Sequence, residues 1–593
     1  MTVNERLTAL RIAMKASGLA AYIVPSSDPH QGEYVAAHWK AREWISGFTG
    51  SAGTVVVTLD HAGLWTDSRY FLQAEEQLKG SSVELHKLNI PHTPEHLEWM
   101  QENLPSGSKA GLDGRLFSVG QVRHLAKKFH PKNIDLDTTS GLISDIWTDR
   151  PPLPQHPVFE LEVKYAGASR GQKIQAVRGK MEKADYHLVS TLDDIAWLFN
   201  LRGGDVPCTP VFYAYAVVAT DAAFLFIEES KVPADLKGKL NKDGVIVMPY
   251  TSIELFLKNI PTGKIISVDL ASTSNQVFNA IDSEKIKEGT NITSSLKAIK
   301  NPVEIQHFKE VMRIDAVALV QLYRWLDETL VKRPVPESEV AVRLNEFRQA
   351  QGGYFGESFD AIAGYNSNGA IVHYHAEPGT CANIKPEGML LLDSGGQYLN
   401  GTTDITRTIA LSKPSVEQKR DFTLVLKGHI ALGNVKFPQG TTGVQLDILA
   451  RMYLWQNGLN YGHGTGHGVG FFNNVHEGPQ GISPTAGTPK ASVTIEPGMV
   501  TSNEPGLYRA GQYGIRTENL VLCVEDEEND FGKFYRFKTL TLFPIDLNLV
   551  DEGLLSDDEK AWINSYHEKV FASVSPLLNE AEKAWLKEKC GKI

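Results

Sequence analysis

Two aspartates flank the turn of an expected β-hairpin over residues 389–411, "MLLLDSGGQYLNGTTDITRTIAL". Asp393 ends an apolar strand, and Asp404 enters a second strand eleven residues later, after a glycine-rich turn. Folding of the hairpin brings the two carboxylates together. Adjacent carboxylates repel each other, so one of them takes up a proton unless a multivalent cation lies between them. For this hairpin alone, a turn-capping role for the aspartates is an equal alternative.

A second stretch, "GMVTSNEPGLYRAGQYGIRTENLVLCVED" over residues 498–526, repeats this plan. Glu504 follows one strand, and Glu518 lies fourteen residues later, within an expected strand over 515–524. Four carboxylates and one imidazole from the intervening chain suit two hard-to-borderline cations, with Mn²⁺ favoured over a single zinc ion. Such a pair lies about 3.5–4 Å apart and activates water as a nucleophile. The two hairpins therefore predict a dinuclear metal centre.

The imidazole between the hairpins comes from "YGHGTGHGVG", residues 461–470, which places His463 and His467 four residues apart. Zinc proteases present two histidines at this spacing on a helix. Here four glycines lie between or beside the histidines, and each would destabilise a helix by about 1 kcal/mol relative to alanine. The glutamate that follows the first histidine of such a helix is also missing. We therefore expect an extended or looped path in which the two histidines have separate roles.

Three further histidines lie in glycine- and asparagine-rich segments of the same region. His373 and His375 belong to "SNGAIVHYHAEP", and His476 follows "GFFNNV". A single histidine is more often a satisfied polar residue than a functional one. The sequence on its own does not place these three side chains around one site.

The region that carries all these residues begins near residue 298. Asn301, Pro302 and Glu304 have the types expected at the N-cap, N1 and N3 positions of a helix, and a long amphipathic pattern follows them. The elements expected after this helix are a second helix over 337–351, a glycine-rich, strand-forming stretch over 353–545 and two C-terminal helices within 551–593.

Ahead of this region, two stretches of the chain resemble each other. In each, a tryptophan opens a short apolar strand that ends in a turn, and a hairpin with an aspartate in its turn follows. The corresponding features are the stretches 42–67 and 195–228, the tryptophans Trp44 and Trp197, and the hairpin aspartates Asp60 and Asp221. We interpret the pair as a duplicated α/β module whose copies meet near residue 160.

The composition narrows the class of protein. The 593 residues are 42% hydrophobic and 22% charged, which is typical of a globular chain with a sizeable core. The net charge of −11 argues against nucleic acid or an anionic membrane as the main partner, and the most apolar stretch, 211–227, is too short and interrupted to cross a bilayer. Four widely separated cysteines indicate a reducing compartment. We expect a soluble cytoplasmic protein that starts with a helix leading into a strand.

Taken in order, "DSGGQYLNGTTDITRT", "GTGHGVG", "NEPG" and "GIRTEN" resemble the five-ligand signature of the pita-bread metallopeptidases of family M24. Other stretches, among them "YIVPSSDPHQGEYVAAHWKAREWISGFTGSAG" and "SFDAIAGYNSNGAIVHYH", resemble the long aminopeptidase P type, the cytosolic Xaa-Pro aminopeptidases. This resemblance covers essentially the whole chain. It implies an α/β fold with two creatinase-like domains, over 1–160 and 161–298, ahead of a pita-bread catalytic domain with a helical extension over 299–593.

The resemblance also implies a role for each acidic residue. Asp393 would bind one metal ion, Asp404 and Glu518 would bridge both ions, and His467 and Glu504 would complete the second. Glu504 would also be the general base. The implied cofactor is a pair of divalent ions, Mn²⁺ with Zn²⁺ or Co²⁺ as alternatives. The implied activity is release of the N-terminal residue from peptides with proline second, by a homodimer.

Five more residues match non-ligand positions of the family. His373, His463 and His476 would bind the peptide around the scissile bond and stabilise the tetrahedral intermediate. Tyr508 and Arg516 would orient the metal ligands.

Within the family, a prolidase-type dipeptidase and a methionine aminopeptidase are the alternatives, although neither is expected to carry the duplicated N-terminal module. A pita-bread protein that acts only as a binding module would show substitutions among the five ligand positions, and none is found here. Two features depart from the pattern, His375 and the stretch "SPTAGTPKAS" over 483–492. We expect both to alter a loop near the rim of the site.

Overall fold

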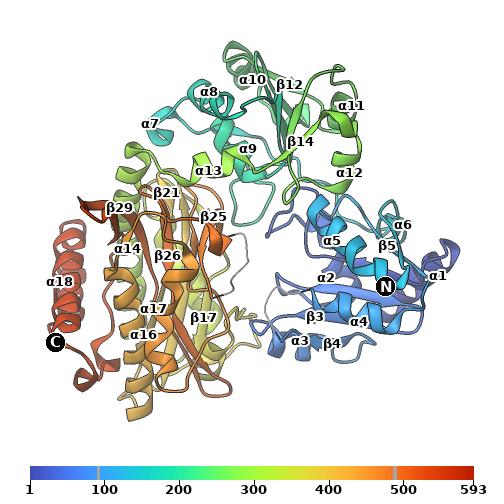
Figure 1. Ribbon diagram of the computed structural model, residues 1–593. Coiled ribbons are helices and arrows are strands. Elements are labelled where there is room, and N and C mark those ends of the chain that lie inside the picture. The colour runs from blue at the N-terminus through green and yellow to red at the C-terminus, as the bar shows by residue number, and fades with distance from the viewer. Residues whose placement is uncertain (90–93, 485–489) are drawn as a thin grey trace. The chain divides into compact units, whose positions relative to one another are not determined.

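The structure is a computed structural model that describes residues 1–89, 94–484 and 490–593. The chain forms two compact units (Figure 1). The first contains residues 1–162 and 168–296, and the second contains residues 163–167 and 297–593. No helix in the described part of the chain is long and apolar enough to cross a membrane.

The first unit contains two six-stranded sheets with the same topology. Their strand orders are β4-β3-β2-β1-β5-β6 and β12-β11-β10-β8-β13-β14. In each sheet the central strand pairs antiparallel with the first strand of a hairpin, and the outer strands join in parallel. This shared order confirms the predicted repeated module. The strands of the first sheet are β1 (Ala21–Val24), β2 (Thr54–Thr58), β3 (Ala62–Thr66), β4 (Glu84–Lys87), β5 (Lys109–Leu112) and β6 (Asp135–Asp137), and those of the second are β8 (Tyr186–Val189), β10 (Ala214–Ala219), β11 (Ala223–Ile227), β12 (Val245–Met248), β13 (Ile266–Asp269) and β14 (Ile286–Gly289).

Helices connect and cover these strands (Figure 1). They are α1 (Val3–Ala16), α2 (Ala41–Ser46), α3 (Phe71–Gln77), α4 (Glu95–Asn103), α5 (Val119–Phe129), α6 (Leu142–Ile146), α8 (Arg170–Lys180), α9 (Leu192–Phe199), α10 (Ala234–Lys242), α11 (Ile253–Lys258), α12 (Asn275–Asn279) and α13 (Ile292–Ala298). A short pair, β7 (Phe159–Glu160) and β9 (Leu201–Arg202), completes the unit.

One detail of the repeat was predicted wrongly. Trp44 lies in α2 and Trp197 in α9, so both tryptophans belong to short helices rather than to strands. A short apolar run does not distinguish a buried helix from a strand by its periodicity. Each helix ends at a left-handed residue, Gly47 (φ 78°) or Asn200 (φ 52°), which explains the turn that follows.

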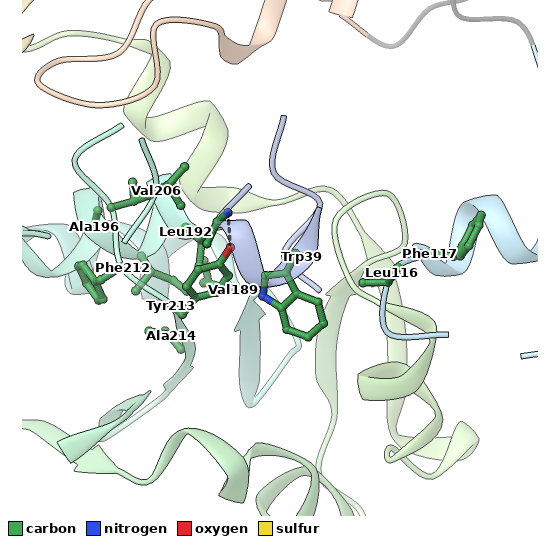
Figure 2. Packing of buried hydrophobic residues seen from close by; sticks show 14 of the residues in the cluster. Trp39, Leu116, Phe117, Val189, Leu192, Ala196, Val206, Phe212, Tyr213 and Ala214 are labelled. Atoms are coloured by element: carbon green, nitrogen blue, oxygen red, sulfur yellow. Dashed lines mark hydrogen bonds between the residues drawn. The ribbon is translucent and has the colours of Figure 1, made fainter. Parts of the chain in front are cut away.

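The two modules of this unit share one hydrophobic core. Figure 2 shows Trp39 and Leu116 of the first module in the same cluster as Leu192 and Phe212 of the second. Between the modules, the backbone N–H of Ala36 donates a 3.2 Å hydrogen bond to the hydroxyl of Tyr213. Burial of this continuous apolar surface is what holds the two modules together as one unit.

The second unit contains the predicted long helix. The side chain of Asn301 accepts hydrogen bonds from the N–H groups of Val303 and Glu304, and the carboxylate of Glu304 accepts one from the N–H of Asn301. This capping box confirms the predicted helix start. The helices of the unit are α7 (Val163–Ala166), α14 (Pro302–Leu330), α15 (Glu337–Gln349), α16 (Val416–Asn434), α17 (Gly443–Trp455), α18 (Asp557–Val574) and α19 (Glu580–Lys589).

Helices α14, α16 and α17 lie against the strands of this unit (Figure 1). Two sheets carry the candidate site, a three-stranded one of order β17-β19-β22 and a six-stranded one of order β23-β30-β29-β26-β24-β25. Their strands are β17 (Ile362–Tyr365), β19 (Met389–Ser394), β22 (Ile405–Ala410), β23 (Lys436–Pro438), β24 (Gly466–Gly468), β25 (Glu477–Ile482), β26 (Val500–Asn503), β29 (Asn519–Asn529) and β30 (Gly532–Thr539). Smaller ladders join β15 (Val335–Pro336) to β18 (Asn383–Ile384), β27 (Gly506–Arg509) to β28 (Tyr513–Arg516), and β16 (Tyr354–Glu357) to β20 (Gly396–Tyr398) and β21 (Gly401–Thr402).

Candidate metal centre

The first predicted hairpin forms and brings its two aspartates to one end. Strand β19 pairs antiparallel with β22, and Asp393 lies opposite Thr406. Asp404 precedes β22 by one residue, so it lies at the same end of the ladder as Asp393. The connection is longer than a simple turn because β20 and β21 form a small ladder of their own within it.

The second hairpin places Glu504 and Glu518 in the same way. Asn503, the last residue of β26, pairs with Asn519, the first residue of β29, so the two glutamates flank one end of that ladder. The prediction that Glu518 lies within a continuous strand is wrong. Strand β28 pairs with β27, whereas β29 pairs with β26, and the chain changes partner between Arg516 and Asn519.

Thr406 connects the two hairpins. Its hydroxyl donates a 2.8 Å hydrogen bond to Oε2 of Glu518, and its carbonyl accepts one of 3.1 Å from the N–H of Glu518. Because Thr406 is also the pairing partner of Asp393, one threonine sets the positions of acidic residues from both hairpins. Sequence reasoning missed Thr406, although Asp404, Thr406 and Thr408 alternate along the chain and therefore share a face of the strand.

His467 completes the cluster from strand β24. Its Nε2 lies 3.4 Å from Oδ2 of Asp404 and 3.6 Å from Oε1 of Glu504. Ligand atoms of Asp404, His467 and Glu518 all lie within 4.8 Å of one another. The extended path confirms that the histidine pair is not helical. A Cβ at Gly466 would overlap the carbonyl of Ser502 on β26, so glycine is required for this close approach of the strands.

The cluster holds more buried negative charge than the nearby cations offset. Burial raises the pKa of Asp404 to about 6. Burial also raises the pKa of Asp393, to which the charge of Asp404 adds, and it raises the pKa of Glu518 well above its ordinary value. The buried Oδ1 of Asp393 accepts no hydrogen bond from any described residue. A carboxylate-rich donor set with an unsatisfied buried oxygen fits a pair of divalent cations.

Arg516 and Tyr508 form a chain of hydrogen bonds behind the acidic residues. Nη2 of Arg516 donates to Oδ2 of Asp393 at 2.7 Å, and Nη1 donates to the hydroxyl oxygen of Tyr508 at 2.7 Å. Burial raises the pKa of Tyr508 to about 12, so the hydroxyl keeps its proton. That proton lies toward Nε2 of His463, 2.8 Å away. The arrangement requires hydrogen on Nδ1 of His463, which lies 2.7 Å from the carbonyl oxygen of Gly464.

The other predicted histidines differ in position. The ring of His476 packs edge-on against His467, with 4.3 Å between centroids. His373 follows Val372, whose carbonyl accepts a 3.5 Å hydrogen bond from Arg516. The exposed His375 lies 3.6 Å from Glu377. Of the stretch 483–492, residues 485–489 lie outside the described residues.

Two further sets of hydrogen bonds hold residues of the site in place and were not predicted from the sequence. Oγ of Ser502 accepts a 3.0 Å hydrogen bond from the N–H of His467 and donates one of 3.3 Å to Oε1 of Glu504. Deeper in the unit, the buried guanidinium of Arg348 on α15 binds Asp315 on α14 and the carbonyl of Gly395 at the end of β19. Only the packing of distant elements brings Arg348 to this strand end.

Comparisons with known proteins agree with this arrangement. Creatinase/prolidase N-terminal domain models match residues 6–146 and 149–304, the model of metallopeptidase family M24 matches 306–525, and the model of the C-terminal region of peptidase M24 matches 533–593. These matches confirm the predicted order of two creatinase-like domains and a pita-bread domain.

Relatives match the chain over nearly its whole length. The chain is 42% identical to a probable Xaa-Pro aminopeptidase P of Laccaria bicolor, over 100% of this chain and 94% of that protein. It is 42% identical to aminopeptidase P2 of Arabidopsis thaliana, over 99% of this chain and 88% of that protein. It is also similar to the crystal structure of an X-prolyl aminopeptidase from Caenorhabditis elegans, described as a cytosolic enzyme with a di-nuclear active site, with a TM-score of 0.94 and 35% identity over the whole of both chains.

Proposed function

Because the chain belongs to the Xaa-Pro aminopeptidases of metallopeptidase family M24, we propose that it hydrolyses the N-terminal Xaa-Pro bond of peptides. The observation that carries this proposal is the convergence of Asp404, His467 and Glu518, with ligand atoms within 4.8 Å of one another. Relatives at 42% identity over the full length, named as Xaa-Pro aminopeptidases, supply the substrate class.

We further propose the assignment of ligands to a pair of Mn²⁺ ions. Asp393, Asp404 and Glu518 would hold one ion, and Asp404, Glu518, His467 and Glu504 would hold the second. The raised pKa values and the unsatisfied Oδ1 of Asp393 support a binding site for multivalent cations. When bound, the two ions supply Lewis-acid chemistry that makes water nucleophilic at neutral pH.

The protein side chains perform the remaining steps. We assign Glu504 as the general base because 19% of its side chain is exposed, against 4% for Asp404 and 12% for Asp393. A general base must lie within reach of the proton that it takes up, which favours the most exposed of these three carboxylates. Hydrogen bonds from Arg516 and Thr406 keep Asp393 and Glu518 in fixed orientations meanwhile.

We assign the histidines around the cluster to binding of the peptide substrate. His373, His463 and His476 hold the carbonyl and amide groups next to the scissile bond and stabilise negative charge that develops on the carbonyl oxygen. His476 packs against His467, which supports a position beside the metal ligands. His463 is held by Tyr508 and Gly464, so its ring is oriented before the substrate arrives.

The wider organisation is also a proposal. We assign the domains to 1–160, 161–298 and 299–593, and the four family matches support boundaries in these regions. We propose a homodimer in the cytoplasm. The four cysteines form no disulfide, which is consistent with a reducing compartment, and the Caenorhabditis elegans enzyme is described as cytosolic.

The decisive experiment compares three substrates with the purified protein in Mn²⁺: a longer Xaa-Pro-Xaa peptide, an Xaa-Pro dipeptide and a Met-Ala peptide. We expect cleavage of the longer peptide at its first bond. Preference for the dipeptide would indicate a prolidase, and cleavage of Met-Ala alone would indicate a methionine aminopeptidase. Metal analysis should find two ions per chain, and removal of the ions by a chelator should abolish activity until Mn²⁺ is restored.

A further inference from the structure

A second group of potential metal ligands lies in the first unit, far along the chain from the catalytic residues. One nitrogen each from His61 and His86 and one carboxylate oxygen of Glu84 lie within 4.8 Å of one another. His61 directly precedes strand β3, and Glu84 and His86 belong to β4, which pairs with β3 in parallel. Because Glu84 and His86 are two residues apart on a strand, they project from the same face of the sheet.

The spacing of the two imidazoles suits a shared ion. Nε2 of His61 lies 3.3 Å from Nε2 of His86. Two nitrogens that each bind a tetrahedral zinc ion at about 2.0–2.1 Å lie about 3.3 Å apart. Oε2 of Glu84 lies 3.9 Å from Nδ1 of His61, and the side chain of Glu84 is 72% exposed. It is therefore free to rotate toward an ion held between the two rings.

Aromatic neighbours hold the two rings in place. The indole of Trp65 stacks on His86, with 4.0 Å between centroids and 12° between planes, and Trp99 packs against His61 at 4.6 Å. Gly63 makes room for this arrangement, since a Cβ there would lie 2.6 Å from Trp65 and 2.8 Å from His86. The imidazoles are thus oriented by packing on Trp65, Trp99 and the backbone at Gly63.

We propose that His61, Glu84 and His86 form a second binding site, for a borderline divalent transition-metal ion such as Zn²⁺. Two imidazoles and one carboxylate, with water in the fourth position, are a common zinc ligand set. A bound ion would connect the start of β3 to β4, two strands that are separated along the chain by helix α3. Strand β4 is the edge of its sheet, so the ion fastens an edge strand that pairs on one side only.

The test uses the full-length protein with its catalytic centre already saturated with Mn²⁺. Equilibrium dialysis against buffered Zn²⁺, followed by metal analysis, compares the wild type with Glu84→Gln and with the double variant His61→Gln/His86→Gln. Glu76→Gln is the matched control, because Glu76 is a glutamate with 73% of its side chain exposed in the same unit. We expect one more zinc ion per chain in the wild type and in the control than in the double variant. We also expect at least about tenfold weaker zinc binding in Glu84→Gln.

Equal zinc content and affinity in all four proteins would overturn the proposal. Glu84→Gln alters only an exposed side chain, so its result stands even if the double variant fails to fold. A second measurement is thermal unfolding. Zinc should raise the Tm of the wild type and of Glu76→Gln by similar amounts, that of Glu84→Gln by less and that of the double variant least, because an ion that binds only the native chain stabilises it. A rise of the same size in every protein would place the ion elsewhere. Peptidase activity in Mn²⁺ should be the same for Glu84→Gln and Glu76→Gln.

Discussion

Replacement of Tyr508 by phenylalanine tests whether the hydrogen-bond chain behind the acidic cluster serves catalysis. The hydroxyl of Tyr508 accepts from Nη1 of Arg516 at 2.7 Å and lies 2.8 Å from Nε2 of His463. Phenylalanine keeps the ring and its packing, so no cavity forms. The substitution therefore removes two hydrogen bonds and leaves all five proposed ligands in place.

The size of the effect follows from the partners. A hydrogen bond to a charged group contributes about 1.5–3 kcal/mol, and a neutral one about 0.5–1.5 kcal/mol. Arg516 keeps its hydrogen bonds to Asp393 and Thr406, and these still offset most of the cost of burying its charge. The loss then falls on the orientation of His463, whose Nε2 loses its hydrogen bond from Tyr508. A deficit of about 0.5–1.5 kcal/mol in the transition state, the range for a neutral hydrogen bond, lowers kcat/KM by about 2- to 12-fold.

The assay measures kcat/KM on an Xaa-Pro-Xaa peptide together with metal content. Tyr513→Phe is the matched control, because Tyr513 lies on the partner strand of the same hairpin and donates a 2.9 Å hydrogen bond to Asp421 instead. We expect two metal ions per chain in both variants and a loss of activity in Tyr508→Phe alone. Equal activity in the two variants, or loss of metal from Tyr508→Phe, would refute the reasoning.

Three further predictions concern other residues. Glu504→Gln should fold and lose nearly all peptidase activity, and activity close to wild type would exclude Glu504 as the base. His467→Ala should lose metal and activity together, whereas His463→Ala should keep the metal and lose mainly kcat; equal metal loss would show that the pair binds as a unit. Burial lowers the pKa of His187 to about 4. Between pH 6.5 and 4 the unfolded chain therefore binds a proton that the native chain does not. The free energy of unfolding falls as the pH falls through this range, by up to about 3 kcal/mol. In His187→Leu, Tm should therefore drop less over this range than in the wild type or the exposed control His130→Gln, and parallel Tm curves would contradict this.

The local signals in the sequence were sufficient for much of the fold. The start of α14 was predictable because Asn301, Pro302 and Glu304 act within one turn of helix. The two acid-bearing hairpins were predictable because strand, turn and strand are contiguous in the chain, so that Asp393 and Asp404 meet without help from distant elements. The repeat was recognisable for the same reason, since each module is built from neighbouring segments.

The resemblance to the family indicated residue roles that the local sequence patterns do not. Nothing in the spacing of His373 or His476 indicated that these side chains belong near His467. Their roles came from the resemblance, and the structure supports a position beside the ligands for His476 through its ring contact. For His373 the nearest observation is the bond from Arg516 to the preceding carbonyl.

Only the tertiary structure decided the remaining features. Glu518 leaves the strand because β28 and β29 have different partners, and strand pairing depends on residues far away in the chain. Thr406 joins two hairpins whose acidic residues are a hundred or more positions apart. The raised pKa values of the carboxylates arise from burial, which no single segment determines. The sequence alone thus specified which residues are able to bind metal, while long-range packing determined their distances, their desolvation and the side chains that hold them.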